Sequence, residues 1–408
     1  MKIELTPQQA SDKAAFQAFV NNHIVPYADH FDQQQSIPSS LIKRIGEQGY
    51  LGLNLPVPHG GDGKDMITLG LLHEEAGRGC SSVRSLLTVH GMVAQSILLA
   101  GSPLLKKQWL SRLATGEVIG AFGLTEPKVG SNAQSVKTQA QRAGDYYVLN
   151  GRKKWISFGQ IAGVFLIFAL CDGKPTAFLV ERDTPGFSIE PIFDMPGTKA
   201  AMLAELYLND CRIPKENLIG REGFGFSHVL PATLDFGRYS VACGSVGIAQ
   251  ACLEACMTYA GERKQFGSSL KDHQLIDKML TDMITSVKAA RLLCYQAGYY
   301  KDVGDPRTLT ETLIAKYFAS TMATRVANEA VRIHGANGSG SDYSVQRYLR
   351  DAKVMEIVEG STQLLEMSIA RYECQTWPWR KSSSLLNHTG ELGERAKQAC
   401  RSGSQILH

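Results

Sequence analysis

The spacing of apolar residues divides the chain into three zones, and the first reads as helical. Up to about Gly116, apolar residues recur at three- and four-residue intervals, as in 41–51 and 93–105. This spacing predicts amphipathic helices. A Gly/Pro-rich stretch, 49–63 (GYLGLNLPVPHGGDG), predicts a connection between two of them.

The pattern changes between about Val118 and Gly223. Short runs rich in β-branched and aromatic residues (YYVLNG, VFLIFAL, TAFLVERD, FSIEPI, AELYLNDCRI) are separated by turn signals such as Asn150-Gly151 and Pro185-Gly186. This arrangement predicts an antiparallel barrel or sandwich, and we expect a barrel.

Long helical patterns with short connectors return from about Phe226 and predict a bundle. We therefore predict an α+β protein. Its expected parts are an N-terminal α-helical domain (1–117), a middle antiparallel β-barrel domain (118–225), a C-terminal four-helix bundle (226–378) and a polar tail (379–408).

Composition narrows the class of protein. The 408 residues are 44% hydrophobic and 20% charged, as in folded proteins, and the net charge of +4 does not favour nucleic acid. Uninterrupted apolar runs such as 164–170 are too short to span a bilayer, so no membrane insertion is expected. The N-terminus has no apolar signal core, and the nine cysteines form no CxxC pair. We expect a cytoplasmic enzyme with reduced thiols.

Common catalytic signatures are missing from the sequence. It contains no GxSxG, P-loop or HExxH motif. The glycine-rich run 335–340 follows a helical pattern rather than a strand, so it is not a dinucleotide-binding fingerprint.

Three local stretches each have a structural and a functional interpretation. The loop 121–132 (AFGLTEPKVGSN) is either an ordinary turn or a set of donors for a polar ring edge. Trp155, in KWIS after an Asn-Gly turn, is either a core aromatic or part of a site. The cations of 262–267 (ERKQFG) either complement a helix end or bind phosphate.

A fourth stretch, 354–363 (VMEIVEGSTQ), places the carboxylate of Glu359 after an apolar pair and before a glycine. On these residues alone, Glu359 is either the solvated end of a helix capped by Gly360 or a base. Glu356, one helical turn earlier, is interpreted as a structural polar residue.

Together and in this order, these motifs resemble those of the acyl-CoA dehydrogenase superfamily, from about Thr6 to about Glu373. The matching pieces are GYLGLNLPVPHGGDG, AFGLTEPKVGSN, KKWISFG, TLDFGR, ERKQFG, HGANG, YLRDAKVMEIVEGSTQ and MSIAR. The resemblance implies an oxidoreductase that acts on the CH–CH bond of an acyl thioester.

The resemblance also implies FAD as the cofactor. The positions that match the family's FAD contacts are Phe122, Leu124, Thr125, Gly130, Ser131, Trp155, Ser157, Arg263, Gln265, Phe266, Gln274, Arg332, Ala336, Thr362 and Gln363. The segment 263–266 commonly reaches the FAD of a neighbouring subunit, so a homotetramer or homodimer is expected. Asn132, Arg332 and Ala336 depart from the family's usual aspartate, glutamine and glycine.

Glu359 coincides with the family's catalytic base. Some relatives place the base just before the arginine of the LDFGR segment, but that position here is Gly237. The resemblance therefore implies α-proton abstraction by Glu359 and hydride transfer to flavin N5. Burial raises the basicity of such a carboxylate, and the backbone amide of the base helps to stabilise the thioester oxygen.

Positions expected to contact the substrate are Arg84, Ser131, Asp235, Arg238 and Gly360. Arg84 lies in an apolar helical pattern, and it resembles the arginine with which glutaryl-CoA dehydrogenases hold a distal carboxylate. The alternative is an internal salt bridge from Arg84 to Glu74 or Glu75.

The combination RSLLTVHGMV, LTEPKVGS and RIHGANG also resembles the branch that oxidises acyl groups on acyl carrier proteins to make hydroxymalonyl or aminomalonyl extender units. This hypothesis places the enzyme in polyketide or nonribosomal peptide biosynthesis. The alternatives are a short-chain or glutaryl-type acyl-CoA dehydrogenase and an acyl oxidase. The electron acceptor is then an electron-transferring flavoprotein or oxygen.

Two relatives of the same fold fit less well. A nucleic-acid-protecting relative needs a clustered positive charge, and a flavin hydroxylase does not need a carboxylate at Glu359.

Overall fold

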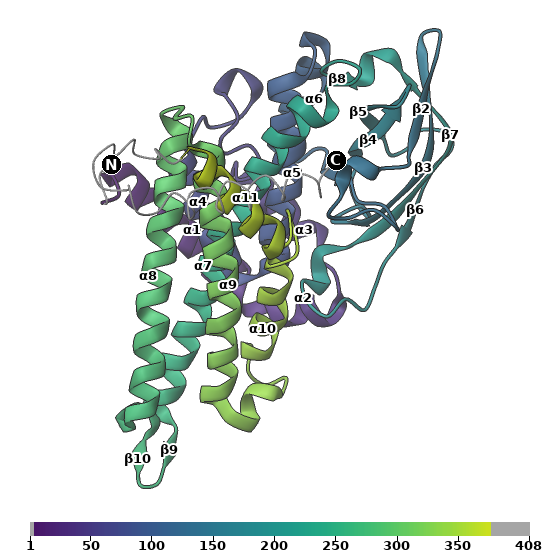
Figure 1. Ribbon diagram of the computed structural model, residues 1–408. Helices are drawn as coiled ribbons and strands as arrows, with labels where there is room; N and C mark the ends of the chain where they lie inside the picture. Colours follow the sequence, from purple (N-terminus) through teal and green to yellow (C-terminus); the bar gives the residue numbers. More distant parts are fainter. Residues whose placement is uncertain (1–3, 377–408) are drawn as a thin grey trace, which may run out of the picture. The chain divides into compact units, whose positions relative to one another are not determined.

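The computed structural model describes residues 4–376 (Figure 1). The predicted polar tail, 379–408, lies outside the described residues. The N-terminal helices are α1 (Pro7–His23), α2 (Ala28–Gln34), α3 (Ser39–Glu47), α4 (Met66–Gly79), α5 (Ser81–Ala100) and α6 (Pro103–Thr115). Side-chain caps explain several of their starts. Thr6 forms a capping box with Gln9, and Asp65 accepts from the amide of Thr68 at 2.6 Å.

The middle region is a mixed β-sheet, so the prediction that its strands pair only in antiparallel fashion is wrong, whereas the expected barrel stays a prediction. Its strands are β1 (Gly120–Gly123), β2 (Gln139–Ala143), β3 (Tyr146–Ile156), β4 (Val164–Cys171), β5 (Lys174–Glu181), β6 (Phe187–Pro191), β7 (Ala204–Pro214) and β8 (Leu218–Ile219). The order is β6-β7-β3-β2-β4-β5-β8, and β1 pairs with β4 outside this path.

The mixed character comes from β4, which pairs in parallel with both β1 and β2. Parallel partners need long connections rather than hairpins, and here the chain from β2 to β4 passes through β3, while the chain from β1 to β4 passes through the loop 124–138, β2 and β3. Strand periodicity indicates which residues face the core but not the direction of each pairing. The sequence pattern therefore predicted the strands and misjudged their arrangement.

The C-terminal region is helical, as predicted. It contains α7 (Leu230–Glu262), the short hairpin β9 (Lys264–Gln265) and β10 (Ser268–Ser269), α8 (Gln274–Asp302), α9 (Thr308–His334), α10 (Val345–Met355) and α11 (Thr362–Thr376). Helices α7, α8 and α9 are long and pack together, and the shorter α10 packs on α7 and α9 (Figure 1). Helix α7 also packs on α4 and α5, so it connects the two helical regions.

Two helical segments, Ser81–Ala100 and Gly225–Glu262, are long and apolar enough to cross a membrane by length and composition. The sequence prediction counted only uninterrupted apolar runs and therefore overlooked them. In the structure, 72% and 67% of their apolar windows are buried inside the protein. Such burial is typical of core helices.

One apolar cluster explains why distant segments meet beside α7. Leu86 and Met92 of α5, Phe158 after β3 and Phe236 of α7 all belong to it, and all are buried. Burial of this apolar surface stabilises the junction of the N-terminal helices, the end of β3 and the start of the bundle. The candidate site lies at this junction.

Candidate active site

Glu359 lies in a tight turn rather than in a solvated helix end. Helix α10 ends at Met355 and α11 begins at Thr362, whose amide donates to the carbonyl of Glu356 at 3.0 Å. Between them, Glu359 and Gly360 both have positive φ values, 56° and 105°. A left-handed conformation costs a non-glycine residue about 1–2 kcal/mol, so surrounding contacts must hold this turn.

The Glu359 side chain is directed at α7. A β-carbon built on Gly237 would lie 2.9 Å from both Cδ and Oε2 of Glu359, and 2.8 Å from Sδ of Met92. Only glycine leaves room for the carboxylate here. Oε2 is buried and has no hydrogen-bond partner among the described residues. Because buried carboxylate oxygens are normally paired, this unpaired atom indicates a functional role.

Two cations, the half-buried Arg238 and the buried Lys316, bind the backbone of this turn. Arg238 Nε donates to the Glu359 carbonyl at 2.9 Å, and Lys316 Nζ donates to the Gly360 carbonyl at 2.7 Å. Burial raises the pKa of Glu359 to about 7, although Arg238, Lys316 and Arg84 oppose the rise. Glu359 is therefore poised to exchange a proton near neutral pH.

Sequence reasoning overlooked Lys316. The available signal was a lone lysine in the apolar run LIAKYFA of a helical segment. By contrast, Glu356 pairs with Lys353 at 2.9 Å. Burial raises the pKa of Glu356, but hydrogen bonds from Thr324 and Lys353 outweigh burial and leave it lowered. These contacts agree with the structural role predicted for Glu356.

Arg84 is 2% exposed on α5, and the predicted alternative of a salt bridge to Glu74 or Glu75 is wrong. Instead, Glu74 pairs with Arg291 at 3.0 Å and Glu75 pairs with Arg78 at 2.8 Å. These partners come from α8 and from α4 itself, and a sequence pattern does not reveal such tertiary competition.

The guanidinium of Arg84 binds only neutral groups among the described residues. It donates to Thr88 Oγ1 at 2.9 Å and to Met355 Sδ at 3.0 Å, while its Nε is buried without a partner. Thr88 Oγ1 lies 2.6 Å from Ser240 Oγ, which lies 3.0 Å from His73 Nδ1. We call Thr88, Ser240 and His73 the polar chain.

Burial, reinforced by the charge of Arg84, lowers the pKa of His73 to about 3, so the imidazole is neutral. The polar chain therefore holds the guanidinium by hydrogen bonds and supplies no negative charge. A buried cation without a counter-charge is costly, and a negatively charged or strongly polar ligand would offset that cost.

Glycines on one face of α7 define the separation of Arg84 and Glu359. A β-carbon on Gly244 would lie 2.9 Å from Arg84 Nε, just as one on Gly237 would touch Glu359. Seven residues of helix correspond to about two turns and a rise of about 10 Å on one face. The carboxylate and the guanidinium are therefore spaced about 10 Å apart along α7.

The loop 121–132, which we call the flavin loop, and the segment of Trp155 are held together by a buried ion pair. Lys153 Nζ is 2.8 Å from Glu126 Oε1 and also donates to the Leu124 carbonyl at 3.1 Å. The amide of Lys154 donates to the Thr125 carbonyl at 2.9 Å. The loop and the end of β3 therefore form one rigid unit.

This unit has the features that a flavin needs. Trp155 is 47% exposed with φ 64°, so a bulky aromatic is held in a costly conformation with its ring accessible. A β-carbon on Gly130 would meet nothing within 4 Å, so the loop is open at that point. Phe122 is half-buried and packs edge-on against Phe168. Ser131 is exposed and Ser157 is half-buried.

The remaining predicted FAD positions lie at several places. Phe266, at the tip of the β9–β10 hairpin with Arg263 and Gln265 nearby, is 97% exposed. In Figure 1 this hairpin lies at the end of α7 and α8 that is remote from the sheet. One chain does not bring the hairpin to the flavin loop, and its predicted contact with a neighbouring subunit stays a prediction. Thr362 and Gln363 begin α11.

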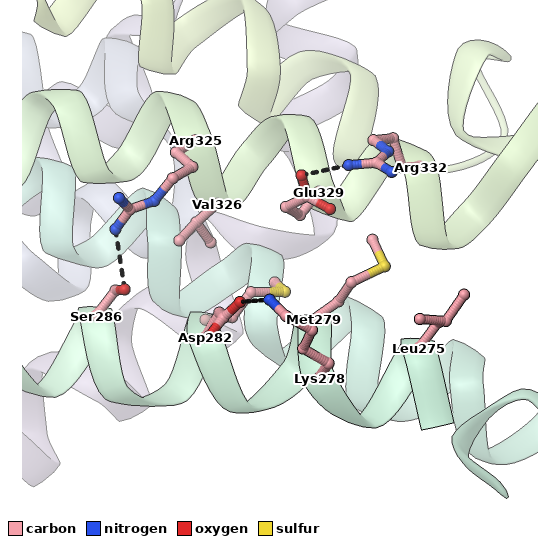
Figure 2. A pocket seen from close by; sticks show the side chains of 10 residues that line it. Leu275, Lys278, Met279, Asp282, Ser286, Arg325, Val326, Glu329 and Arg332 are labelled. Carbon is pink, nitrogen blue, oxygen red and sulfur yellow. Dashed lines mark hydrogen bonds and ion pairs between the residues drawn. The ribbon is translucent and has the colours of Figure 1, made fainter. Parts of the chain in front are cut away.

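Gln274 begins α8, and Arg332 lies near the end of α9, shortly before Ala336. Arg332 pairs with Glu329 at 2.7 Å and lines a groove of about 540 Å³ between α8 and α9 (Figure 2). The groove is lined by Leu275, Lys278, Met279, Asp282, Met283, Ser286, Arg325, Val326, Glu329 and Arg332. It includes neither Glu359 nor Arg84.

Of the other predicted substrate positions, Asp235 forms an ion pair with Lys301 and keeps Oδ1 without a partner among the described residues. The side chain of Arg238 is engaged with the backbone of Glu359. Arg238 and Gly360 therefore contribute to the turn that holds the base. Within the described residues, no cluster of side chains is suited to bind a metal ion.

Comparisons with known proteins show which proteins this chain resembles in sequence and in structure. Probable acyl-CoA dehydrogenase YngJ from Bacillus subtilis is 40% identical over 378 residues, covering 91% of this chain and 99% of YngJ. A solved structure of a glutaryl-coenzyme A dehydrogenase in complex with glutaryl-CoA is 36% identical, with a TM-score of 0.88 and coverage of 92% and 97%.

A structure of FkbI, described as acting in biosynthesis of the methoxymalonyl extender unit of Fk520, is 30% identical with a TM-score of 0.82, covering 89% of this chain and 99% of FkbI. Family models for the N-terminal, middle and C-terminal domains of acyl-CoA dehydrogenases match residues 6–117, 121–211 and 223–373. The chain belongs to the acyl-CoA dehydrogenase family.

Proposed function

We propose that this enzyme oxidises a short acyl thioester with a negatively charged or strongly polar group at the far end of its acyl chain. Glu359 removes the α-proton, and Arg84 binds the distal group. The observation that carries the proposal is the buried, unpaired Oε2 of Glu359, in a carboxylate whose pKa is raised to about 7.

The turn at Glu359 suits a proton transfer at the α-carbon. A carboxylate with a pKa near neutrality is a stronger base than a solvated one, yet a large fraction is still ionised at pH 7. The amide of Glu359 has no acceptor among the described residues. This amide is therefore free to donate to the thioester oxygen as negative charge develops there.

Acyl-CoA dehydrogenases are FAD-dependent oxidoreductases of CH–CH bonds, and one structural neighbour is a complex with FADH2. The flavin loop and Trp155 would hold the isoalloxazine ring, consistent with the exposed indole and the open Gly130. When bound, FAD supplies the acceptor for the β-hydride. The chain itself orients the substrate, excludes water and holds the proton on Glu359.

The spacing along α7 favours a short acyl group. About 10 Å separates the carboxylate and the guanidinium, and each contact takes up about 3 Å. The remaining about 4 Å corresponds to a few carbon–carbon bonds between the α-carbon and the distal group. A fatty chain would be too long and would leave Arg84 without a counter-charge.

CoA is the carrier that we favour, because a glutaryl-CoA dehydrogenase matches this chain over most of both lengths. An acyl carrier protein is the second candidate. It is supported by the likeness to FkbI, whose description links it to a polyketide extender unit. Arg84, which has no counter-charge among the described residues, suits a small acidic acyl group on either carrier and does not discriminate between them.

The first experiment follows flavin absorbance under anaerobic conditions while single thioesters are added. Glutaryl-CoA and succinyl-CoA should bleach the flavin at lower concentration than the neutral butyryl-CoA. The same acyl groups on a carrier protein test the second candidate. Equal bleaching by all lengths and charges would contradict the proposed substrate class, and peroxide release in air would identify oxygen as the acceptor.

Substitution of Arg84 tests its assigned contact. Arg84→Met keeps an unbranched apolar stem and removes the guanidinium charge, so KM for acidic thioesters should rise about 100-fold, with little change for butyryl-CoA. Arg325→Met, in the groove between α8 and α9, is the control and should change neither value. An unchanged preference in Arg84→Met would assign Arg84 a structural role.

A further inference from the structure

Lys316 is a buried charge whose contacts do not explain its presence. It is 0% exposed on α9, and no carboxylate of the described residues lies within ion-pair distance of its Nζ. Its hydrogen bond goes to the uncharged carbonyl of Gly360 at 2.7 Å. A neutral donor would satisfy a carbonyl at a much smaller desolvation cost.

The location of the bond suggests its purpose. Glu359 and Gly360 are consecutive residues in the left-handed region, and their two carbonyls are taken by Arg238 from α7 and Lys316 from α9. The turn is therefore held from two sides by helices that are distant in sequence: Arg238 is 121 residues from Glu359, and Lys316 is 44 residues from Gly360. Neither cation contacts the carboxylate, which stays unpaired beside Gly237.

We propose that Lys316 is a positioning residue for proton abstraction: it fixes the turn through the Gly360 carbonyl and supplies positive charge that favours the ionised form of Glu359. This inference rests on the proposed role of Glu359 as the base. A direct salt bridge would stabilise the carboxylate but would also occupy the oxygen that must take the proton. A cation that binds a backbone carbonyl can stabilise the nearby carboxylate by its charge and still leave the carboxylate oxygen free to take the proton.

The charges around Glu359 come from three helices. Arg84 is on α5, Arg238 on α7 and Lys316 on α9, and all three favour the ionised carboxylate, while burial opposes it. Asp235 faces Arg238, and Glu356 faces Lys316, so each of these cations is also near an acidic group. Removal of one cation from this set shifts the proton equilibrium of Glu359 toward the protonated form.

The test compares Lys316→Met, Lys316→Gln and Lys316→Arg as FAD-loaded enzymes. Lys316→Met removes both the charge and the hydrogen bond. We expect its kcat/KM at pH 7 to fall about 100-fold and the acid limb of its pH profile to move upward by about one pH unit. Lys316→Gln retains a donor without charge, so the limb should move while kcat falls less. Lys316→Arg should restore the position of the limb.

Lys288→Met, at an exposed lysine of α8, is the control and should leave the profile unchanged. An unmoved acid limb in both Lys316→Met and Lys316→Gln would overturn the proposal, as would failure of both variants to yield folded, yellow enzyme while the control folds. Glu359→Gln tests the role of the base separately from the role of Lys316. If substrate still bleaches the flavin of Glu359→Gln, the proposed base is wrong. If it does not, the base stands, and the Lys316 variants alone test the positioning role.

Discussion

Two glutamates of this protein have opposite environments: Glu126 is buried, and Glu359 is half-buried with its Oε2 atom buried. Glu126 accepts from Lys153 Nζ at 2.8 Å, from Thr138 Oγ1 at 2.6 Å, and from the amides of Lys137 and Thr138. Burial raises its pKa, but the charge of Lys153 and these hydrogen bonds outweigh burial and leave it lowered.

The carboxylate of Glu359 has no such hydrogen bonds to its Oε2 atom, although three cations lie around it. Arg238 and Lys316 bind backbone carbonyls, Arg84 binds neutral side chains, and burial dominates, so the pKa is raised to about 7. The comparison teaches that burial alone does not mark a catalytic carboxylate. The distinguishing feature is whether neighbouring donors bind the carboxylate oxygens or are directed elsewhere.

The largest expected difference between the two glutamates is in the effect of substitution on the rate of the reaction. Glu359→Gln keeps the shape of the side chain but removes the base, so the rate of flavin bleaching by substrate should fall about 10⁴-fold. FAD should remain bound, since the flavin loop is untouched. Stopped-flow absorbance under anaerobic conditions measures the rate. Bleaching at the wild-type rate would remove the proposed mechanism.

Glu126→Gln should instead affect stability. It leaves Lys153 buried with a weakened partner, which should lower the free energy of unfolding by about 3 kcal/mol. Because the pair holds the flavin loop against β3, FAD should also dissociate more readily. Denaturant unfolding and retention of the yellow colour on dilution test this. A variant as stable as wild type would show that the ion pair is dispensable.

The pH dependence of the two carboxylates should also have opposite signs. The pKa of Glu359 in the folded state lies above its ordinary value of 4.5, so its contribution to stability falls as pH rises through 4.5 to about 7. The pKa of Glu126 is lowered, so its contribution is present above its ordinary pKa and is lost as pH falls through the folded value.

In activity, protonation of Glu359 should produce an acid limb in kcat/KM near pH 7, with a tenfold loss for each pH unit below it. A profile that stays flat down to pH 5 would contradict the raised pKa. The stability difference between Glu359→Gln and wild type, measured at pH 5 and pH 8, gives an independent check: the substitution should be relatively more favourable at pH 8.

The smallest expected effect concerns the polar chain that holds Arg84. Thr88→Val removes one hydrogen bond to the guanidinium and should raise KM for acidic thioesters about fivefold, with kcat and the KM of butyryl-CoA unchanged. Thr285→Val, at an exposed position of α8, serves as the control. Equal changes for acidic and neutral substrates would mean that Thr88 only supports packing.

Much of the fold could be predicted from local patterns, and the errors are physically instructive. The helical N-terminal and C-terminal regions and the β-rich middle were predicted correctly, because periodicity reflects which face of an element is buried. The prediction of purely antiparallel pairing was wrong because β1 and β2 both pair in parallel with β4, and the direction of a strand is not encoded in its local residue pattern. The predicted domain boundaries and oligomeric state stay predictions.

For the site, the motifs around Glu359, Trp155 and the flavin loop were sufficient to predict the family, the enzyme class and FAD, and the comparisons confirm all three. The partners of Arg84 could not be predicted. Glu74 and Glu75 pair instead with Arg291 of α8 and Arg78 of α4. Arg84 itself contacts Met355, at the end of α10, and Thr88, one turn further along α5.

The sequence by itself determined most of the elements and the family, and it singled out Glu359, which stands before Gly360 between two helices. Only the tertiary structure decided what surrounds that carboxylate: the space left by Gly237, the cations of α5, α7 and α9, and the unpaired oxygen. The physical reason is that a side chain's charge and burial depend on atoms brought from distant parts of the chain, whereas periodicity depends only on neighbours in sequence.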